Sequence, residues 1–156
     1  MSVVVTPRGT RGVQMPRMPA LRAFMRFMNE MMFRIFKNRR FQNANVLALT
    51  TVGAKTGQQR RSTVVYFPNE DNSFCIVASA GGTANHPAWF FNIARNPDKV
   101  WVQMGDRQFK VTPETLSGDE RAIAWKRIAT QSPVFAGYET KTDREIPVVR
   151  LRPSAT

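Results

Sequence analysis

The apolar residues of this chain change their spacing near residue 45, and that change restricts the fold more than any other feature. From Asn45 onward they recur in short runs with a period of two, which is the spacing of β-strands that bury one face. Turn-forming glycine, proline and asparagine residues separate the runs, so neighbouring strands are expected to pair as hairpins. The expected strands are 45–51, 60–67, 74–79, 99–104, 107–112 and 146–151.

Three helical segments are expected around these strands. Residues 20–37 place apolar side chains at the i, i+3, i+4 and i+7 spacing of an amphipathic helix. A short helix is expected over 87–94, and Ser117 with Glu120 has the spacing of a capping box before a helix that ends near Gln131. The predicted fold class is therefore mainly β with flanking helices (α+β), as a small barrel or a partly open sheet.

The domain organisation predicted from the chain is simple, because 156 residues suit one domain. Residues 1–19 contain three prolines and three arginines and are predicted to form a flexible basic arm. Residues 20–156 are predicted to form a single domain that begins with the amphipathic helix over 20–37.

Charge is distributed unevenly along the chain. It carries 23 Lys and Arg against 11 Asp and Glu, a net charge of +12. Residues 1–61 hold twelve of the basic residues and a single acid, Glu30, whereas residues 62–156 are nearly balanced. Such asymmetry indicates an anionic partner, which is a nucleic acid, lipid head groups, or a phosphorylated or carboxylated ligand.

The helix expected over 20–37 has two interpretations. Its Met and Phe face can pack on the domain, or it can lie in a membrane interface while its arginines meet anionic head groups. The two are compatible if the helix moves.

Cysteine and histidine are too scarce for several kinds of site. One cysteine excludes an intrachain disulfide, and with one histidine, His86, it excludes the common zinc sites, so no metal is expected. No apolar run approaches the roughly 20 residues of a membrane span. Residues 1–19 lack the apolar centre of a signal peptide, so the expected location is the cytoplasm.

The segment from Gly53 to Thr63 carries the densest chemical signal. A glycine-flanked turn exposes backbone donors, and three cations and three hydroxyls lie within eleven residues, which suits a phosphate or carboxylate. The spacing is not that of a P-loop. The alternative is a solvated basic hairpin turn. The residues concerned are Lys55, Thr56, Arg60, Arg61, Ser62 and Thr63.

Two further segments suggest a site for a flat ring. Small residues at 78–82 allow a ring to approach the backbone closely, although an ordinary loop explains them too. The aromatic stretch 86–92 is explained by core packing, while Asn92 offers an amide to orient a ligand, and His86 is interpreted as structural. Tyr138 either donates a proton beside a redox ring or is a half-buried residue at the pocket edge.

Taken in order, the segments 49–60, 78–82, 86–92, 96–97 and 141–147 resemble the deazaflavin-dependent nitroreductase family. The resemblance runs from about Val46 to Pro153. It implies a split β-barrel, like the FMN-binding split barrel, that binds coenzyme F420, a deazaflavin with a phosphate and an oligoglutamate tail. The sequence departs from relatives at Phe135 and Lys141, where tyrosines are common, which leaves the acceptor open.

The resemblance also implies roles for residues. Lys55 and Arg60 would meet the phosphate and tail, and Ser79 and Tyr138 would act on the acceptor oxygen or the second proton. The other residues implied to bind the cofactor are Ala54, Thr56, Arg61 and Ser62 near the anionic end, and Val77, Ala78, Ser79, Ala80, Gly81, Ala88, Trp89 and Asn92 around the ring.

The function implied is hydride transfer from reduced coenzyme F420 to a hydrophobic acceptor such as a quinone, an enone or a nitroaromatic. FMN on the same barrel is the alternative cofactor. A basic membrane-binding or nucleic-acid-binding module is the non-enzymatic alternative. No specific nucleic acid is expected, because the aromatics follow core periodicity and form no exposed stacking stripe. Beside a cytoplasmic location, peripheral contact with the inner face of the membrane through residues 20–37 is the second expectation.

Overall fold

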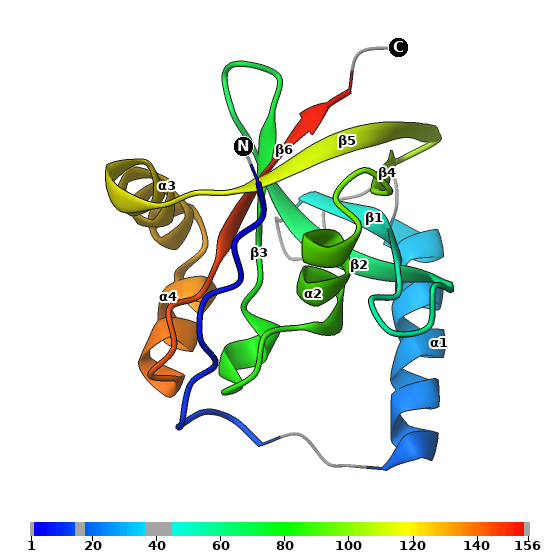
Figure 1. Ribbon diagram of the computed structural model, residues 1–156, viewed down its shortest axis with the longest axis horizontal. Helices are drawn as coiled ribbons and strands as arrows, with labels where there is room; N and C mark the ends of the chain where they lie inside the picture. Colours follow the sequence, from blue (N-terminus) through cyan, green and yellow to red (C-terminus); the bar gives the residue numbers. More distant parts are fainter. Residues whose placement is uncertain (1, 15–17, 37–44, 155–156) are drawn as a thin grey trace.

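Six antiparallel strands close into a barrel in the computed structural model, which describes residues 2–14, 18–36 and 45–154 (Figure 1). Around the barrel their order is β1-β2-β3-β6-β5-β4. The bounds are β1 Asn45–Val52, β2 Gln59–Pro68, β3 Phe74–Val77, β4 Trp101–Met104, β5 Arg107–Thr115 and β6 Val148–Pro153. The predicted class, a mainly β barrel with flanking helices, is confirmed.

The hairpins form at the turns that the sequence predicts. β1 pairs with β2 along its whole length, and Met104 faces Arg107 across the two-residue turn Gly105-Asp106. β4 also pairs with β1, as at Leu49 and Val102, and this contact closes the barrel. Closure leaves the sheet without an unpaired edge.

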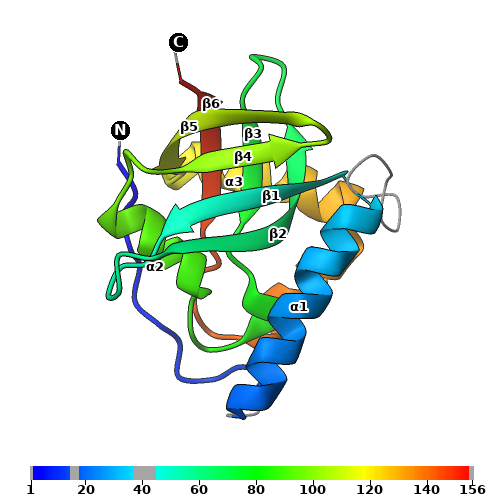
Figure 2. The same ribbon diagram turned by 90° about the vertical axis from the view of Figure 1, so that its right-hand side faces the viewer.

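The helices lie outside the barrel, as Figure 2 shows, with α1 along β1 and β2. Their bounds are α1 Pro19–Phe36, η1 Ala80–Gly82, α2 Ala88–Arg95, α3 Gly118–Gln131 and α4 Pro133–Lys141. The helix over 20–37 is confirmed within its described part, and its last residue lies outside the described residues.

Three local predictions need correction. α4 was not expected, since Gly137 and a weak apolar period conceal it. Pro87 is the extended residue before α2 and not its first helical residue. Ser117 precedes α3, but its side chain makes no capping hydrogen bond, so the predicted capping box does not form.

The apolar core has two parts. One fills the barrel and includes Phe90 and Ile93 of α2, which are fully buried. The other lies between the barrel and α3 and α4, around Trp125 and Ile128. α2 is therefore fixed at one end of the barrel, next to the turn between β1 and β2.

The N-terminal segment is extended and lies against the barrel domain (dark blue in Figure 1). The N–H of Gly9 donates to Ala84 O at 2.8 Å, and Val13 forms a parallel bridge with Thr83. The sequence predicts a flexible arm over 1–19. These contacts, which were not foreseen, attach residues 2–14 to the domain.

Candidate functional site

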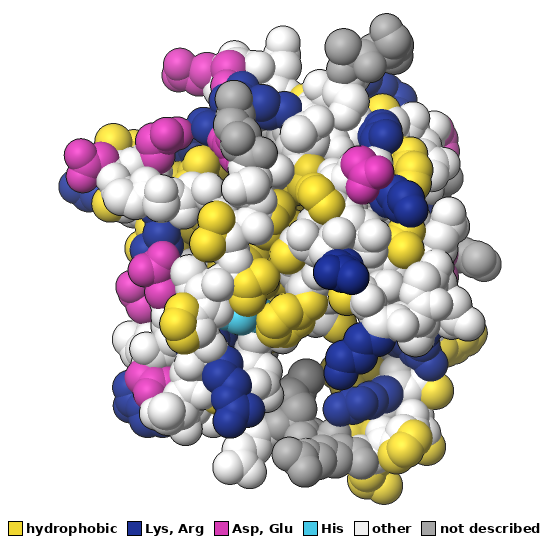
Figure 3. Space-filling view, viewed as in Figure 1, with side chains coloured by type: hydrophobic (Ala, Val, Ile, Leu, Met, Phe, Trp, Pro, Cys, Tyr) yellow, Lys and Arg dark blue, Asp and Glu magenta, His cyan; other side chains and the backbone are white. Residues whose placement is uncertain are grey.

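A cavity of about 1210 Å³ opens between α1, the turn from β1 to β2, the start of β2, and α2. In the space-filling view, Lys and Arg side chains gather beside a hollow in the lower part of the molecule (Figure 3). The lining residues are Arg22, Met25, Arg26, Gly53, Ala54, Lys55, Thr56, Gln59, Arg60, Arg61, Ser62, Asn85, His86, Ala88, Trp89, Phe91 and Asn92. Five of them are cationic, and no described Asp or Glu lines the cavity.

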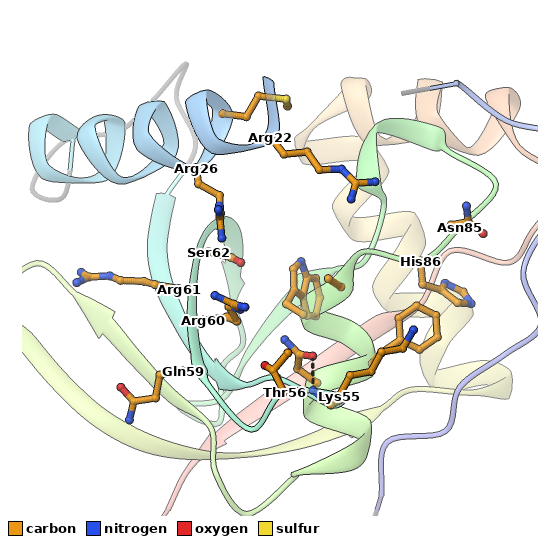
Figure 4. Close-up of a pocket in the computed structure, with 17 residues that line it drawn as sticks. Arg22, Arg26, Lys55, Thr56, Gln59, Arg60, Arg61, Ser62, Asn85 and His86 are labelled. Carbon is orange, nitrogen blue, oxygen red and sulfur yellow. Dashed lines mark hydrogen bonds between the residues drawn. The ribbon is translucent and has the colours of Figure 1, made fainter. Parts of the chain in front are cut away.

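The cations come from three elements. Arg22 and Arg26 point down from α1, Lys55 lies in the β1–β2 turn, and Arg60 and Arg61 begin β2 (Figure 4). Arg61 is already engaged, since its Nη2 donates to Gln103 Oε1 at 2.7 Å and its Nη1 lies 3.4 Å from Glu30.

The other four cations form no salt bridge with any described residue. Like charges held together without acids repel one another, and a bound anion relieves that repulsion. The cavity is therefore suited to a ligand that carries several negative charges.

The β1–β2 turn is held from beneath by two asparagines of the α2 region. The buried Asn92 accepts the N–H of Ala54 on Oδ1 at 3.0 Å and donates to Thr51 Oγ1 at 3.1 Å. Asn96 donates to Val52 O at 3.2 Å. These bonds attach the turn to α2 and the residue that follows it, and the Ala54 N–H, which the resemblance placed near the anionic end of the cofactor, has a partner within the protein.

One wall of the cavity is apolar. Ala88, Trp89 and Phe91 of α2 form it, Met25 of α1 also lines the cavity, and Trp89 is 7% exposed. A flat aromatic ligand gains favourable contact with such a wall and loses water on binding.

His86 lies at the edge of this wall with both ring nitrogens in hydrogen bonds. Nε2 lies 2.8 Å from Thr6 O, and Nδ1 lies 3.1 Å from Arg144 Nη1. Burial lowers the pKa of His86 below 6.5, and the Arg144 guanidinium lowers it further, although the hydrogen bond to Thr6 opposes them. The imidazole is therefore neutral at neutral pH.

Nine of the residues predicted to bind the cofactor line this cavity. They are Ala54, Lys55, Thr56, Arg60, Arg61, Ser62, Ala88, Trp89 and Asn92. Five others do not: Val77, Ala78, Ser79, Ala80 and Gly81. Between the end of β3 and the start of α2, the chain lines the cavity only at Asn85 and His86.

Ser79 and Tyr138, predicted to act on the acceptor, come from adjoining elements but do not line the cavity. Ser79 is buried, and its carbonyl accepts from Arg144. Tyr138 is half-buried against Phe135, with Lys141 Nζ 5.5 Å from the centre of its ring. Their predicted roles stay predictions.

Eight further lining residues were not among the named cofactor-binding residues, although Gly53, Gln59 and Phe91 lie in segments predicted to contribute. The eight are Arg22, Met25, Arg26, Gly53, Gln59, Asn85, His86 and Phe91. The charge excess of the first 61 residues contained a signal for Arg22 and Arg26. Their distance along the chain from the Gly53–Thr63 segment hid the connection.

Two kinds of feature are absent from the described ranges. No helix there combines the length and the apolar character that crossing a bilayer requires. No group of three or more His, Cys, Asp and Glu side chains is arranged there to hold a metal ion.

Comparison with known proteins gives concordant matches. A family model described as F420H(2)-dependent quinone reductase matches residues 21–153. F420H(2)-dependent quinone reductase Rv1261c of Mycobacterium tuberculosis is 35% identical over 108 residues, which is 67% of this chain and 71% of the relative. The putative F420H(2)-dependent quinone reductase Rv3178 of the same organism is 35% identical over 64% of this chain and 82% of its own.

A solved structure titled as an F420-H2 dependent reductase (FDR-A) superposes with a TM-score of 0.61. It is 39% identical in sequence and covers 69% of this chain and 94% of its own. The heme storage protein HutZ of Vibrio cholerae, at 15% identity and a TM-score of 0.52 over 82% and 92% of the two chains, shares the fold alone.

Proposed function

The chain belongs to the F420H(2)-dependent quinone reductase family, and from this premise we propose that the cavity beside α1 holds the anionic end of coenzyme F420. As a member it is an enzyme, an oxidoreductase whose cofactor is coenzyme F420 and whose acceptor is a quinone. The resemblance found in the sequence is thereby confirmed.

The proposal is carried by one observation: five cations line the cavity, no described Asp or Glu lines it, and only Arg61 among the five forms a salt bridge with a described residue. Coenzyme F420 bears a phosphate and several carboxylates, and guanidinium groups bind both in paired hydrogen bonds. Lys55 and Arg60 would hold the phosphate, and Arg22 and Arg26 on α1 would face the tail. FMN has no glutamate tail and would leave most of these charges unmatched.

When bound in its reduced form, coenzyme F420 supplies the hydride that reduces the acceptor. The protein contributes position and exclusion of water. Trp89 and Ala88 form the apolar wall against which we place the flat ring. Ser79, which precedes η1, and Tyr138 of the adjoining α4 are proposed to bind the acceptor oxygen.

A fluorescence-quenching titration with coenzyme F420 and with FMN tests this proposal. Wild-type protein is expected to bind the deazaflavin with micromolar or tighter affinity and to prefer it to FMN. Lys55→Ala with Arg60→Ala is expected to weaken binding by at least about 10- to 100-fold, because the loss of a single charge-assisted hydrogen bond already costs about 1.5–3 kcal/mol.

Lys110→Ala is the matched control, because Lys110 is exposed on β5 and lies outside the cavity. Equal loss in the control, or preference for FMN, would reject the site.

We also propose that α1 contacts the membrane at the inner face of the cell. Phe24 and Phe27 are 58% and 64% exposed, and Met25 is 47% exposed, although α1 packs on β1 and β2. Exposed apolar residues beside arginines are typical of helices that lie in a membrane interface. This contact would keep the cavity close to membrane-dissolved quinones.

Flotation with anionic vesicles tests the membrane contact. Phe24→Ser with Phe27→Ser is expected to abolish flotation, while Ile123→Ser, at a 72% exposed position on α3, is expected to leave it unchanged. Truncation of residues 1–37 is a poorer test, because it also removes the attached segment 2–14. Flotation that the double variant does not change would refute the contact.

A further inference from the structure

Three segments that are far apart in the sequence meet beside the cavity, and we call their meeting the joint: residues 6–13, 78–86 and 142–144. Their hydrogen bonds are independent of the cations that line the cavity. The joint includes His86, and through it the joint reaches the cavity wall.

Arg144 is the centre of the joint and is only 5% exposed. Its guanidinium donates to Ser79 O at 2.7 Å, to Thr83 O at 2.8 Å and to Ala78 O at 3.1 Å. It also donates to His86 Nδ1. None of these acceptors is a carboxylate, so this buried charge is stabilised by carbonyl and imidazole dipoles that a lysine's compact ammonium does not satisfy together.

The N-terminal segment closes the joint from outside. Asp143 accepts the N–H of Thr10 at 2.8 Å and the N–H of Arg11 at 2.9 Å, and the Thr10 hydroxyl also donates to it. Glycine is required for the approach, because a Cβ on Gly9 would lie 2.4 Å from Asp143 Oδ1 and one on Gly12 would lie 2.3 Å from Ala84 N.

The backbone inside the joint is conformationally unusual. Ala80, Gly81 and Gly82 have φ values of 46°, 65° and 82°. An alanine in the left-handed region persists where its surroundings determine the conformation. Arg144 supplies that constraint, since its acceptors stand on both sides of the turn, at residues 78–79 and 83.

The state of His86 follows from its partners. Arg144 can only donate, so Nδ1 must be the acceptor and carries no proton. The proton therefore lies on Nε2, which donates to Thr6 O at 2.8 Å. With both nitrogens engaged, the imidazole has no free site for a substrate proton.

We propose that Arg144 is a positioning residue. It fixes His86 as the neutral Nε2–H tautomer and thereby holds in place the part of the cavity lining that His86 forms. His86 contributes shape to the site and no proton. The effect on reduction rests on the proposed function, whereas the effect on His86 does not.

The experiment uses the fact that His86 is the chain's one histidine, so nitrogen-15 NMR of its ring reports on the joint alone. In the wild-type protein Nε2 is expected to be protonated and Nδ1 unprotonated at neutral pH. In Arg144→Lys we expect a mixture of the two neutral tautomers, because the guanidinium donor that now faces Nδ1 is lost. Arg152→Lys, a surface change that keeps its partner Asp71, is the matched control.

A second variant keeps the test decisive if Arg144→Lys does not fold. Asp143→Ala removes the acceptor of the Thr10 and Arg11 N–H groups. It is expected to free the segment for trypsin cleavage after Arg8 and Arg11 and to shift the Nε2–H signal of His86. In folded Arg144→Lys, quinone reduction is expected to fall about tenfold while the dissociation constant of coenzyme F420 changes less than about threefold.

Unchanged His86 signals in folded Arg144→Lys would overturn the proposal. If that variant is unfolded, an uncut segment and unchanged signals in Asp143→Ala would overturn it. Failure of the wild-type protein to bind coenzyme F420 would reject the proposed function instead. The NMR result would still test whether Arg144 fixes the tautomer of His86.

Discussion

The protein uses arginine in two opposite ways in neighbouring regions. Around the cavity, Arg22, Arg26 and Arg60 are exposed and form no salt bridge with any described residue. In the joint, Arg144 is buried and directs its donors to three carbonyls and His86. Cations that the fold leaves unsatisfied are available to a ligand, whereas a cation that the fold satisfies serves the structure.

The largest effect that separates the two regions is on stability. Arg144→Met leaves three buried carbonyls without their donor, and we expect it to lower the free energy of unfolding by about 3 kcal/mol or more. Arg152→Met breaks only a partly exposed ion pair with Asp71 and should cost less than about 1 kcal/mol. Urea denaturation measures the free energy of unfolding of both variants. Similar losses in the two would contradict the special structural role of Arg144.

The cavity cations should show the reverse behaviour. Arg22→Ala with Arg26→Ala is expected to weaken the affinity for coenzyme F420 by about tenfold or more, with the free energy of unfolding changed by less than about 0.5 kcal/mol per site. Fluorescence titration and urea denaturation of the same preparations test this. A loss of stability without a loss of affinity would show that these arginines have a structural role, as Arg144 does, and do not bind the ligand.

Salt should affect the two regions unequally. Exposed charges are screened over a Debye length of about 10 Å at 0.1 M ionic strength and about 3 Å at 1 M. Affinity for coenzyme F420 is therefore expected to fall between 0.05 and 0.5 M salt, on the order of several-fold. The nitrogen signals of His86 should not move over that range, and NMR and titration at matched salt check the contrast.

The smallest expected effect is a pH dependence of stability that arises in the joint. The Thr10 hydroxyl and the N–H of Arg11 hold the pKa of Asp143 at about 2, below its ordinary 3.8. This stabilisation is present above pH 3.8 and is lost as the pH falls toward 2.

His86 acts in the same direction at higher pH. Its pKa is lowered, so its neutral form stabilises the fold above pH 6.5 and protonation removes that contribution as the pH falls. Thermal unfolding from pH 8 to pH 3 should show two declines. Asp143→Asn should remove only the lower one, and a wild-type curve that is flat above pH 5 would contradict the neutral histidine.

The barrel was predictable because its information is local. The alternating apolar pattern of a strand such as β5 and a turn such as Gly105-Asp106 each specify their own geometry within a few residues. α4 was missed for the same reason, since its local pattern is weak and its packing against α3 decides its structure.

The site was half predictable. The cations near Lys55 are neighbours in the sequence, so their shared role was visible there. The contribution of Arg22 and the approach of Gly12 to Ala84 depend on tertiary contacts that no short segment encodes. The same holds for the 141–147 segment, whose Arg144 forms a structural joint that its sequence alone did not indicate.

The most direct measurement of the central claim is a cycle of four affinities. Wild-type protein and Lys55→Ala with Arg60→Ala are each titrated with coenzyme F420 and with its deazaflavin core, which lacks the phosphate and the glutamates. The account predicts that the wild-type protein prefers the complete cofactor by about 10- to 100-fold and that the variant loses most of that preference. Equal preference in both proteins would show that the cavity cations do not bind the anionic end.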